Sequence, residues 1–240
     1  MIENNLFLEI NEQPEALRRI FQAYIAKDNS KLQQAASLIR SSKNVIFTGM
    51  ATSEDASYGP SSLLNEKGIN NFVYDASELI HYHLPTLYQP DTCLVLVSQS
   101  GYSAEIVRMI DEIRGKVPVI GVFNDETSYL AGNCDIGLPI YAGPQLACGS
   151  KTNLSTIAVL LILAEAVLEG NLQAAGERLL AVSDSIERFL KDWESSVEPA
   201  VEFLRDSPYT VVLGRGPGRA SAMFTSVLFR EVPKIVAEGM

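Results

Sequence analysis

The residues best suited to chemistry lie at 98–103, where the sequence reads Ser-Gln-Ser-Gly-Tyr-Ser. The hydroxyls of Ser98, Ser100 and Ser103 surround Gly101, which allows the backbone to turn tightly and to approach a ligand. An apolar run precedes this segment and a helical pattern follows it, so the segment should open a helix. The first N–H groups of a helix and the helix dipole favour an anion. The segment therefore predicts a phosphate-binding turn, and capping of the helix by Ser100 or Ser103 is the alternative.

Two further segments could complete such a site. Thr52 and Ser53 follow another apolar run, and they could bind sugar hydroxyls or only cap a helix. Lys151 lies where a long apolar helix begins, so it could offset phosphate charge or be an ordinary surface lysine. Both alternatives stay open for each segment.

The two histidines, His81 and His83, do not form an evident metal site. A spacing of two residues does not place them on one face of a helix, and no carboxylate or thiolate is in register with them. We therefore expect no metal. General acid–base work by one histidine, for example in opening a sugar ring, stays open.

A glycine-rich segment at 214–218 superficially resembles a dinucleotide-binding loop. Its spacing departs from Gly-x-Gly-x-x-Gly, and Pro217 removes a backbone donor where one is needed. We therefore expect no nicotinamide cofactor, and nothing in the sequence calls for another organic cofactor.

Strand and helix patterns alternate along the chain. Short apolar runs typical of buried strands occupy 44–48, 71–74, 92–97, 117–123 and 135–138. Helical patterns occupy 14–25, 30–39, 52–66, a stretch from about 77, 103–113, 150–168 and 172–204, the last with a stop near Pro199. This alternation predicts an α/β fold with a doubly wound parallel sheet and helices on both faces. Ligands of such folds bind at the carboxyl ends of the strands, where both polar clusters fall.

The same pattern suggests a division of the chain into four parts. We expect N-terminal helices at 1–40, a first α/β domain at 41–170, a helical connector at 171–208 and the first strand–helix unit of a second domain at 209–240. One strand and one helix cannot bury their own apolar faces, so we expect the rest of that second domain to be missing.

Composition limits the partners and the compartment. The net charge of −10 argues against nucleic acid, whose phosphates need a basic surface. We expect no membrane span, because no apolar run reaches the required length and Glu165 and Glu169 interrupt the longest one. The N-terminus lacks the basic segment of a signal peptide, and the three cysteines suit reduced thiols, so we expect a cytoplasmic protein.

Several motifs together resemble one known family. Ser98, Gln99, Ser100 and Gly101, with the hydroxyl of Ser103 two residues further on, resemble the phosphate-binding Ser-Gln-Ser-Gly-x-Thr motif of sugar isomerase (SIS) domains. The segments 9–14, 51–53, 76–79, 213–216 and 237–238 are similar to motifs of the isomerase half of glucosamine-6-phosphate synthase. The resemblance covers nearly the whole chain.

The resemblance implies a five-stranded flavodoxin-like sheet per domain, a homodimer and a sugar-phosphate ligand, such as a hexose or hexosamine 6-phosphate. It implies that the phosphate is held by Ser98, Gln99, Ser100 and Ser103. Thr52 and Ser53 would contact phosphate or sugar, and Lys151 matches a family lysine. Glu231 matches the glutamate base that moves a proton between carbons 1 and 2 of the sugar, a role that requires partial desolvation.

The sequence also departs from the family pattern. Leu228 stands where the family has a lysine, Gly149 replaces a sugar-contacting serine, and the ring-opening histidine segment would follow Met240. Our leading hypothesis is an enzyme of the phosphosugar isomerase, deaminase, deglycase or aminotransferase type that uses Glu231. The alternative is a non-catalytic, regulatory phosphosugar-binding module, and a remnant with a structural role is a third hypothesis.

Overall fold

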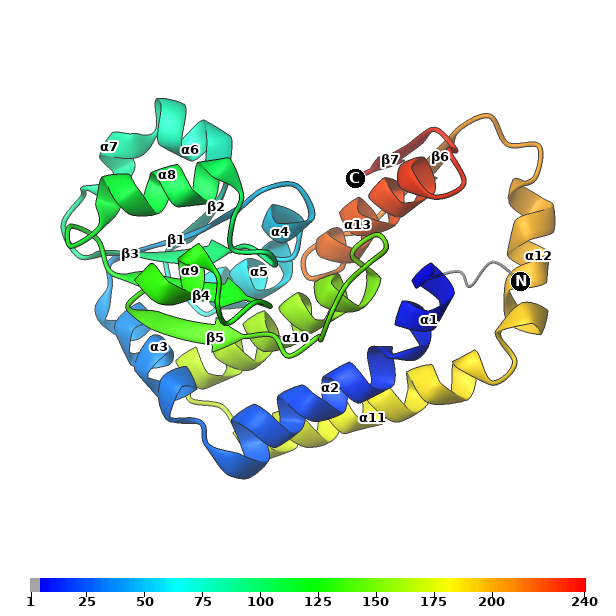
Figure 1. The fold of residues 1–240 in the computed structure, drawn as a ribbon, viewed down its shortest axis with the longest axis horizontal. Coiled ribbons are helices and arrows are strands. Elements are labelled where there is room, and N and C mark those ends of the chain that lie inside the picture. Colours follow the sequence, from blue (N-terminus) through cyan, green and yellow to red (C-terminus); the bar gives the residue numbers. More distant parts are fainter. Residues whose placement is uncertain (1–4) are drawn as a thin grey trace.

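A five-stranded parallel sheet forms the centre of the protein in the computed structural model, which describes residues 5–240 (Figure 1). The strands are β1 (Asn44–Gly49), β2 (Asn71–Asp75), β3 (Thr92–Val97), β4 (Val119–Phe123) and β5 (Ile136–Pro139). Their order across the sheet is β2-β1-β3-β4-β5, so the direction of winding reverses between β1 and β3. Gly49 and Val97, which end these two strands, are paired in register, and the loops that follow them therefore start side by side. The predicted α/β fold is confirmed.

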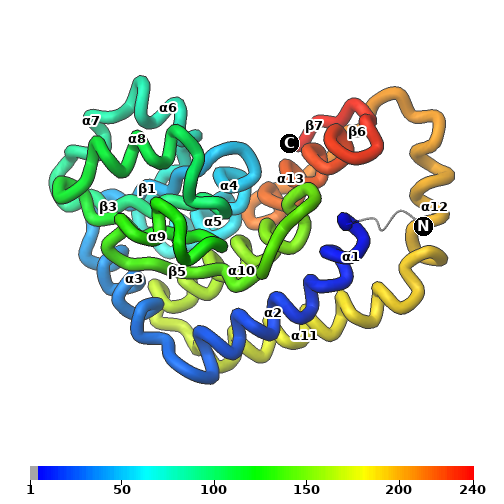
Figure 2. Tube along the Cα trace, in the orientation of Figure 1, coloured from blue at the N-terminus to red at the C-terminus, as the bar shows by residue number. Residues whose placement is uncertain are grey.

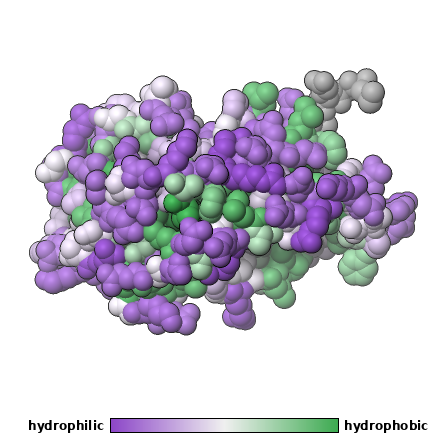
Figure 3. All heavy atoms as spheres, turned by 90° about the horizontal axis from the view of Figure 1, so that it is seen from below, coloured by the Kyte–Doolittle hydropathy of each residue, from purple (hydrophilic) through white to green (hydrophobic). Residues whose placement is uncertain are grey.

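Alternating strand residues fill two hydrophobic cores, one on each face of the sheet. Val45 and Phe47 of β1 contribute to the first core and Ile46 to the second, as the alternation of side chains in a strand requires. The first core is covered by α2 (Gln13–Phe21), α3 (Ser30–Ser41), α5 (Tyr58–Glu66) and α10 (Ser150–Val167). The second is covered by α6 (Ala76–Tyr82), α7 (Leu84–Leu87), α8 (Ala104–Ile113) and α9 (Tyr129–Asn133). Hydrophilic side chains predominate on the outer face seen in Figure 3, with smaller apolar groups between them.

The helix α10 departs from the expectation that no segment is long and apolar enough to cross a membrane. It passes that test by length and composition, but 78% of it is buried inside the protein. Its apolar residues pack into the first core, so α10 is the central helix of the fold.

Helices from both ends of the chain form an arm beside the sheet (Figure 2). The helices α1 (Asn5–Asn11) and α2 come first, and a π-helical stretch η1 (Gln22–Lys27) continues α2. The helix α11 (Leu172–Leu190) packs along α2, and the buried hydroxyl of Ser183 donates to the carbonyl oxygen of Pro14 over 2.9 Å. The arm continues into α12 (Trp193–Leu204), none of whose residues is buried.

Two predicted helix boundaries are wrong. The predicted helix 52–66 is divided into α4 (Thr52–Asp55) and α5, because Pro60 lies in the first turn of α5, where a missing N–H is tolerated. Pro199 does not stop a helix but lies inside α12. The carbonyl that it deprives of a partner belongs to the exposed Ser195, where water can satisfy it. The break falls instead at Asp192, whose carboxylate accepts from the hydroxyl of Ser195 over 2.7 Å.

The last residues form a strand–helix–strand unit rather than the predicted strand and helix. The strand β6 (Thr210–Val212), the helix α13 (Gly218–Glu231) and the strand β7 (Ala237–Gly239) make a separate two-stranded parallel sheet. The strand β7 is three residues long and contains a glycine, so no apolar run in the sequence indicates it. The helix α13 packs on α4 and α5.

Candidate functional site

A pocket of about 400 Å³ opens at the carboxyl ends of β1 and β3, where the winding of the sheet reverses. Parallel sheets bind ligands at such positions. Its lining residues are Met50, Thr52, Ser53, Ser98, Gln99, Ser100, Ser103, Asn124, Asp125, Gln145 and Thr152. Six of the seven residues predicted to bind substrate therefore line one pocket.

The turn after β3 is held by hydrogen bonds between its own hydroxyl and N–H groups. The hydroxyl oxygen of Ser98 accepts from the N–H of Gly101 over 3.1 Å, and that of Ser100 accepts from the N–H of Tyr102 over 3.3 Å. Gly101 has φ +68°, so the turn uses the left-handed region that glycine occupies freely. Ser103 precedes the first residue of α8 but makes no side-chain capping bond. The capping alternative therefore does not describe Ser103, whose side chain lines the pocket instead.

The loop after β1 brings Thr52 and Ser53 to the same pocket. Both residues begin α4, and the helix is preceded by Ala51 rather than capped by a hydroxyl. A side chain at Gly49 would place its Cβ 2.8 Å from both the Cβ of Ser53 and the carbonyl oxygen of Val97. The absence of a side chain at Gly49 thus allows α4 to approach the end of β3 closely.

Two buried polar atoms of the pocket have no protein partner among the described residues. They are Nε2 of Gln99 and Oγ1 of Thr152. A buried donor or acceptor without a partner is costly in free energy unless a ligand or water satisfies it. These atoms therefore mark where a polar ligand would bind.

The charge of the pocket comes from one carboxylate. Asp125 is the one charged residue among the described lining residues. The hydroxyl and the N–H of Thr127 both donate to its Oδ1, and these hydrogen bonds lower the pKa of Asp125. An ionised Asp125 can accept from ligand hydroxyls, whereas an anion must be held by hydroxyl and N–H donors.

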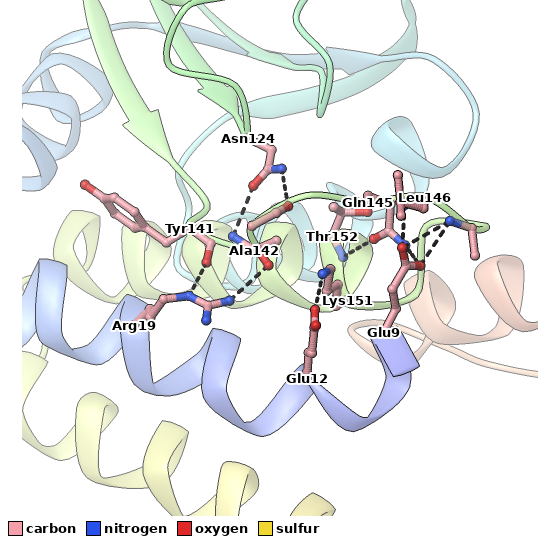
Figure 4. Close-up of polar contacts among 12 residues, drawn as sticks. Glu9, Glu12, Arg19, Asn124, Tyr141, Ala142, Gln145, Leu146, Lys151 and Thr152 are labelled. Carbon is pink, nitrogen blue, oxygen red and sulfur yellow. Dashed lines mark hydrogen bonds and ion pairs between the residues drawn. The ribbon is translucent and has the colours of Figure 1, made fainter. Parts of the chain in front are cut away.

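Lys151 does not reach the pocket. Its side chain is only 2% exposed, and its ammonium group is paired with the carboxylate of Glu12, at the junction of α1 and α2 (Figure 4). Neither expectation for Lys151 describes this position, since the ammonium group neither lines the pocket nor lies on the surface. The face of α10 that carries Lys151 is turned toward the N-terminal helices.

Glu231 lies outside the residues that line the pocket. It ends α13 and is exposed, whereas the predicted role calls for a partly desolvated carboxylate. Burial first, and the nearby carboxylate of Glu231 second, raise the pKa of the Cys148 thiol. Glu231 is therefore close enough to the loop that joins β5 to α10 to act on the charge of Cys148. Leu228 lines a separate apolar pocket of about 410 Å³ with Leu6 and Ile10.

The histidines lie away from the pocket. His81 and His83 are exposed near the end of α6, and the ring of His83 lies 5.2 Å from that of Tyr74, centroid to centroid. Among residues 5–240, no three histidine, cysteine or acidic side chains are grouped as metal ligands would be.

Four polar residues of the pocket were missed in the sequence. Asn124 and Asp125 directly follow β4, and their position after a strand of the same sheet could have indicated them. Gln145 and Thr152 had no such signal, because the loop and helix that carry them reach the pocket only through tertiary packing.

The chain is similar in sequence to glutamine–fructose-6-phosphate aminotransferases. A glutamine–fructose-6-phosphate aminotransferase (isomerizing) from Pseudomonas putida is 30% identical to this chain over 96% of the chain's length. The matched region makes up 40% of the length of that aminotransferase. Two solved structures share the fold. The C-terminal domain of glucosamine-fructose-6-phosphate aminotransferase from Francisella tularensis has a TM-score of 0.79 and 20% identity, with coverage of 99% of this chain and 70% of that one. A tagatose-6-phosphate ketose/aldose isomerase from Escherichia coli has a TM-score of 0.74 and 19% identity, with coverage of 96% and 65%.

The family model for the SIS domain matches residues 38–169. This range contains the whole five-stranded sheet and both turns that line the pocket. The resemblance drawn from the motifs is thereby confirmed. Because the match spans more than half of the chain, the protein belongs to the SIS domain family.

Proposed function

We propose that this protein binds a sugar phosphate, a hexose or hexosamine 6-phosphate, in the pocket between β1 and β3. The single observation that carries the proposal is the convergence of Thr52, Ser53 and the 98–103 turn on one pocket with unpartnered buried polar atoms. The phosphate is held by the hydroxyls and N–H groups at the start of α8. The sugar extends toward Asn124, Gln145 and Thr152. The names of the relatives, which contain fructose 6-phosphate and tagatose 6-phosphate, support this ligand class.

The proposed reaction is a proton transfer between carbons 1 and 2 of the sugar, of the phosphosugar isomerase or aminotransferase-like type. The carboxylate of Glu231 takes the proton from carbon 2 of the open-chain aldose and returns it to carbon 1, while the hydroxyl proton moves from oxygen 2 to oxygen 1. The intermediate is an enediol, or an enediolamine when an amino group is present. No metal or organic cofactor takes part in this scheme. For Glu231 to act, α13 must approach the pocket more closely than it does in this structure.

A second function, binding without catalysis, is favoured by a specific observation. Glu231 is exposed and Leu228, in the place of the family lysine, faces an apolar pocket. A regulatory module of this kind would bind the sugar phosphate and leave it unchanged.

A binding and turnover experiment tests the proposal. Ser100→Ala removes one hydroxyl from the phosphate site and should weaken binding of glucose 6-phosphate or glucosamine 6-phosphate roughly 10-fold to 100-fold in calorimetric titration. Ser185→Ala, which removes an exposed hydroxyl on α11, is the matched control and should leave the affinity unchanged. Unchanged binding in Ser100→Ala would show that the phosphate site is assigned wrongly.

Turnover separates the two functions. If the protein is an isomerase, incubation with the aldose 6-phosphate yields the ketose, and Glu231→Gln binds the sugar phosphate but does not convert it. If the wild-type protein binds without conversion, the regulatory function is supported and the catalytic one is refuted.

We also propose a cytoplasmic homodimer in which 209–240 is the opening of a second domain of the same kind. The exposed apolar side chains of Val201 and Phe203, on a helix without buried residues, support a second copy of the chain. Sedimentation velocity tests the dimer: a monomer at micromolar concentration would contradict it.

A further inference from the structure

The loop at 140–149 joins β5 to α10 and is hydrogen-bonded to the N-terminal helices (Figure 4). It has no helix or strand of its own, and Leu146 at its tip is 77% exposed. Few packing contacts can therefore hold this tip, and its position must depend on hydrogen bonds. Gln145 from this loop lines the pocket.

The first half of the loop is anchored by Arg19 and Asn124. The guanidinium of Arg19 donates to the carbonyl oxygens of Tyr141 and Ala142 over 2.8 and 3.0 Å. The amide of Asn124 donates to the carbonyl oxygen of Gly143 over 2.8 Å and accepts from the N–H of Ala142 over 3.1 Å. These contacts end before Gln145.

The second half of the loop converges on the carboxylate of Glu9. This residue is 4% exposed and is the one buried residue of α1. Its carboxylate accepts from the backbone N–H groups of Leu146 and Ala147, the latter over 3.1 Å, and from the side-chain amide of Gln145. Hydrogen bonds to a carboxylate are about twice as strong as those between neutral groups, so one buried side chain holds three donors of the loop.

These bonds also fix the orientation of Gln145. Its amide nitrogen donates to Glu9 and to the carbonyl oxygen of Cys148, the latter over 3.1 Å, and its amide oxygen accepts from the N–H of Thr152 over 3.2 Å. Thr152 carries one of the two unpartnered polar atoms of the pocket. A Cβ placed on Gly149 would lie 3.6 Å from the amide oxygen of Gln99, so the end of the loop lies close to the Gln99 side chain.

We propose that Glu9 is a positioning residue of the pocket, which holds Gln145 where it contacts the sugar portion of the ligand. The inference rests on the proposed function, because it assumes that a sugar phosphate occupies the pocket. Glu9 does not line the pocket itself and acts through Gln145. Its effect should therefore fall on the sugar and not on the phosphate.

The test compares two ligands in three variants. Glu9→Gln keeps the size of the side chain but removes the charge that holds the loop donors. It should weaken binding of glucose 6-phosphate or glucosamine 6-phosphate about 10-fold and change the affinity for inorganic phosphate less than about 2-fold. Gln145→Ala should show the same selective loss, and the double variant should lose no more than Gln145→Ala alone, since the two residues act in series. Glu15→Gln, at an exposed carboxylate of α2, is the matched control.

Hydrogen exchange gives an independent readout without ligand. The backbone amides of Leu146 and Ala147 should exchange at least about 10-fold faster in Glu9→Gln than in the wild type, while amides of the sheet stay unchanged. Equal loss of both ligands, or an unchanged exchange rate, would overturn the role of Glu9. A wild type that binds no sugar phosphate would overturn the proposed function and this inference together. A wild type that binds, with an unchanged ratio of affinities in Glu9→Gln, would overturn this inference alone.

Discussion

Replacing Gly101 by alanine should lower the free energy of unfolding by roughly 3–6 kcal/mol. Gly101 has φ +68°, which costs alanine about 1–2 kcal/mol. The new Cβ would also lie 2.5 Å from the Cβ of Ser128 and 3.3 Å from that of Leu130. Ser128 is buried and its hydroxyl oxygen caps α9 by accepting from the N–H of Ala131 over 3.2 Å. Displacing it adds the loss of a cap, about 1 kcal/mol, to the cost of overpacking.

Gly115→Ala provides the matched control. Gly115 has φ +70°, and no heavy atom lies within 4 Å of a Cβ built on it, so this variant bears the backbone cost alone. Urea denaturation of the wild type and both variants gives the two losses, provided that the slopes of the transitions agree. Gly101→Ala should also weaken binding of inorganic phosphate, whereas Gly115→Ala should not.

The decisive quantity is the difference between the losses of unfolding free energy in Gly101→Ala and Gly115→Ala. If Gly101→Ala costs no more than Gly115→Ala, the turn is not packed against Ser128 as described, and the reasoning is refuted. A further variant checks the cause. Combining Gly101→Ala with Ser128→Gly removes the side chain that the new Cβ meets. The double variant should therefore lose less unfolding free energy than the sum of the losses in the two single variants.

Two other predictions concern charged groups. Burial first, and the Glu54 carboxylate second, raise the pKa of Asp55 to about 6 from 3.8, so the folded protein keeps this proton after the unfolded chain has lost it. The stability contributed by protonated Asp55 is present below pH 3.8 and is lost as the pH rises through about 6. The melting temperature of Asp55→Asn minus that of the wild type should therefore rise as the pH is raised from 4 to 7. Asp206→Asn, which changes an exposed carboxylate, is the control and should not show this rise. Glu12→Gln leaves the 2%-exposed ammonium group of Lys151 without its carboxylate and should cost about 1–3 kcal/mol in urea denaturation. Adding Lys151→Met should recover most of that loss, and a neutral effect of Glu12→Gln would contradict the pairing.

The sequence by itself determined the sheet and much of the pocket. Apolar runs predicted each strand of the main sheet to within two residues at either end. The turns around Ser53 and Ser100 could be assigned to one site because parallel strands end on the same edge of their sheet. Local residue types also predicted the phosphate turn, since a glycine among hydroxyls at the start of a helix suits an anion wherever the helix packs. Both inferences depend on local strand and turn conformations, which do not change with how the helices pack.

Only the tertiary structure decided which other side chains reach the pocket. Lys151 and Thr152 are neighbours in α10, yet Lys151 turns to Glu12 and Thr152 lines the pocket, because the direction of a helical side chain depends on how the helix is packed. The contact that orients Gln145 joins residues 136 positions apart in the sequence. The position of Glu231 likewise depends on how α13 returns to α4 and α5. Contacts between segments so distant in the sequence leave no local pattern, since each depends on how whole helices pack around the sheet.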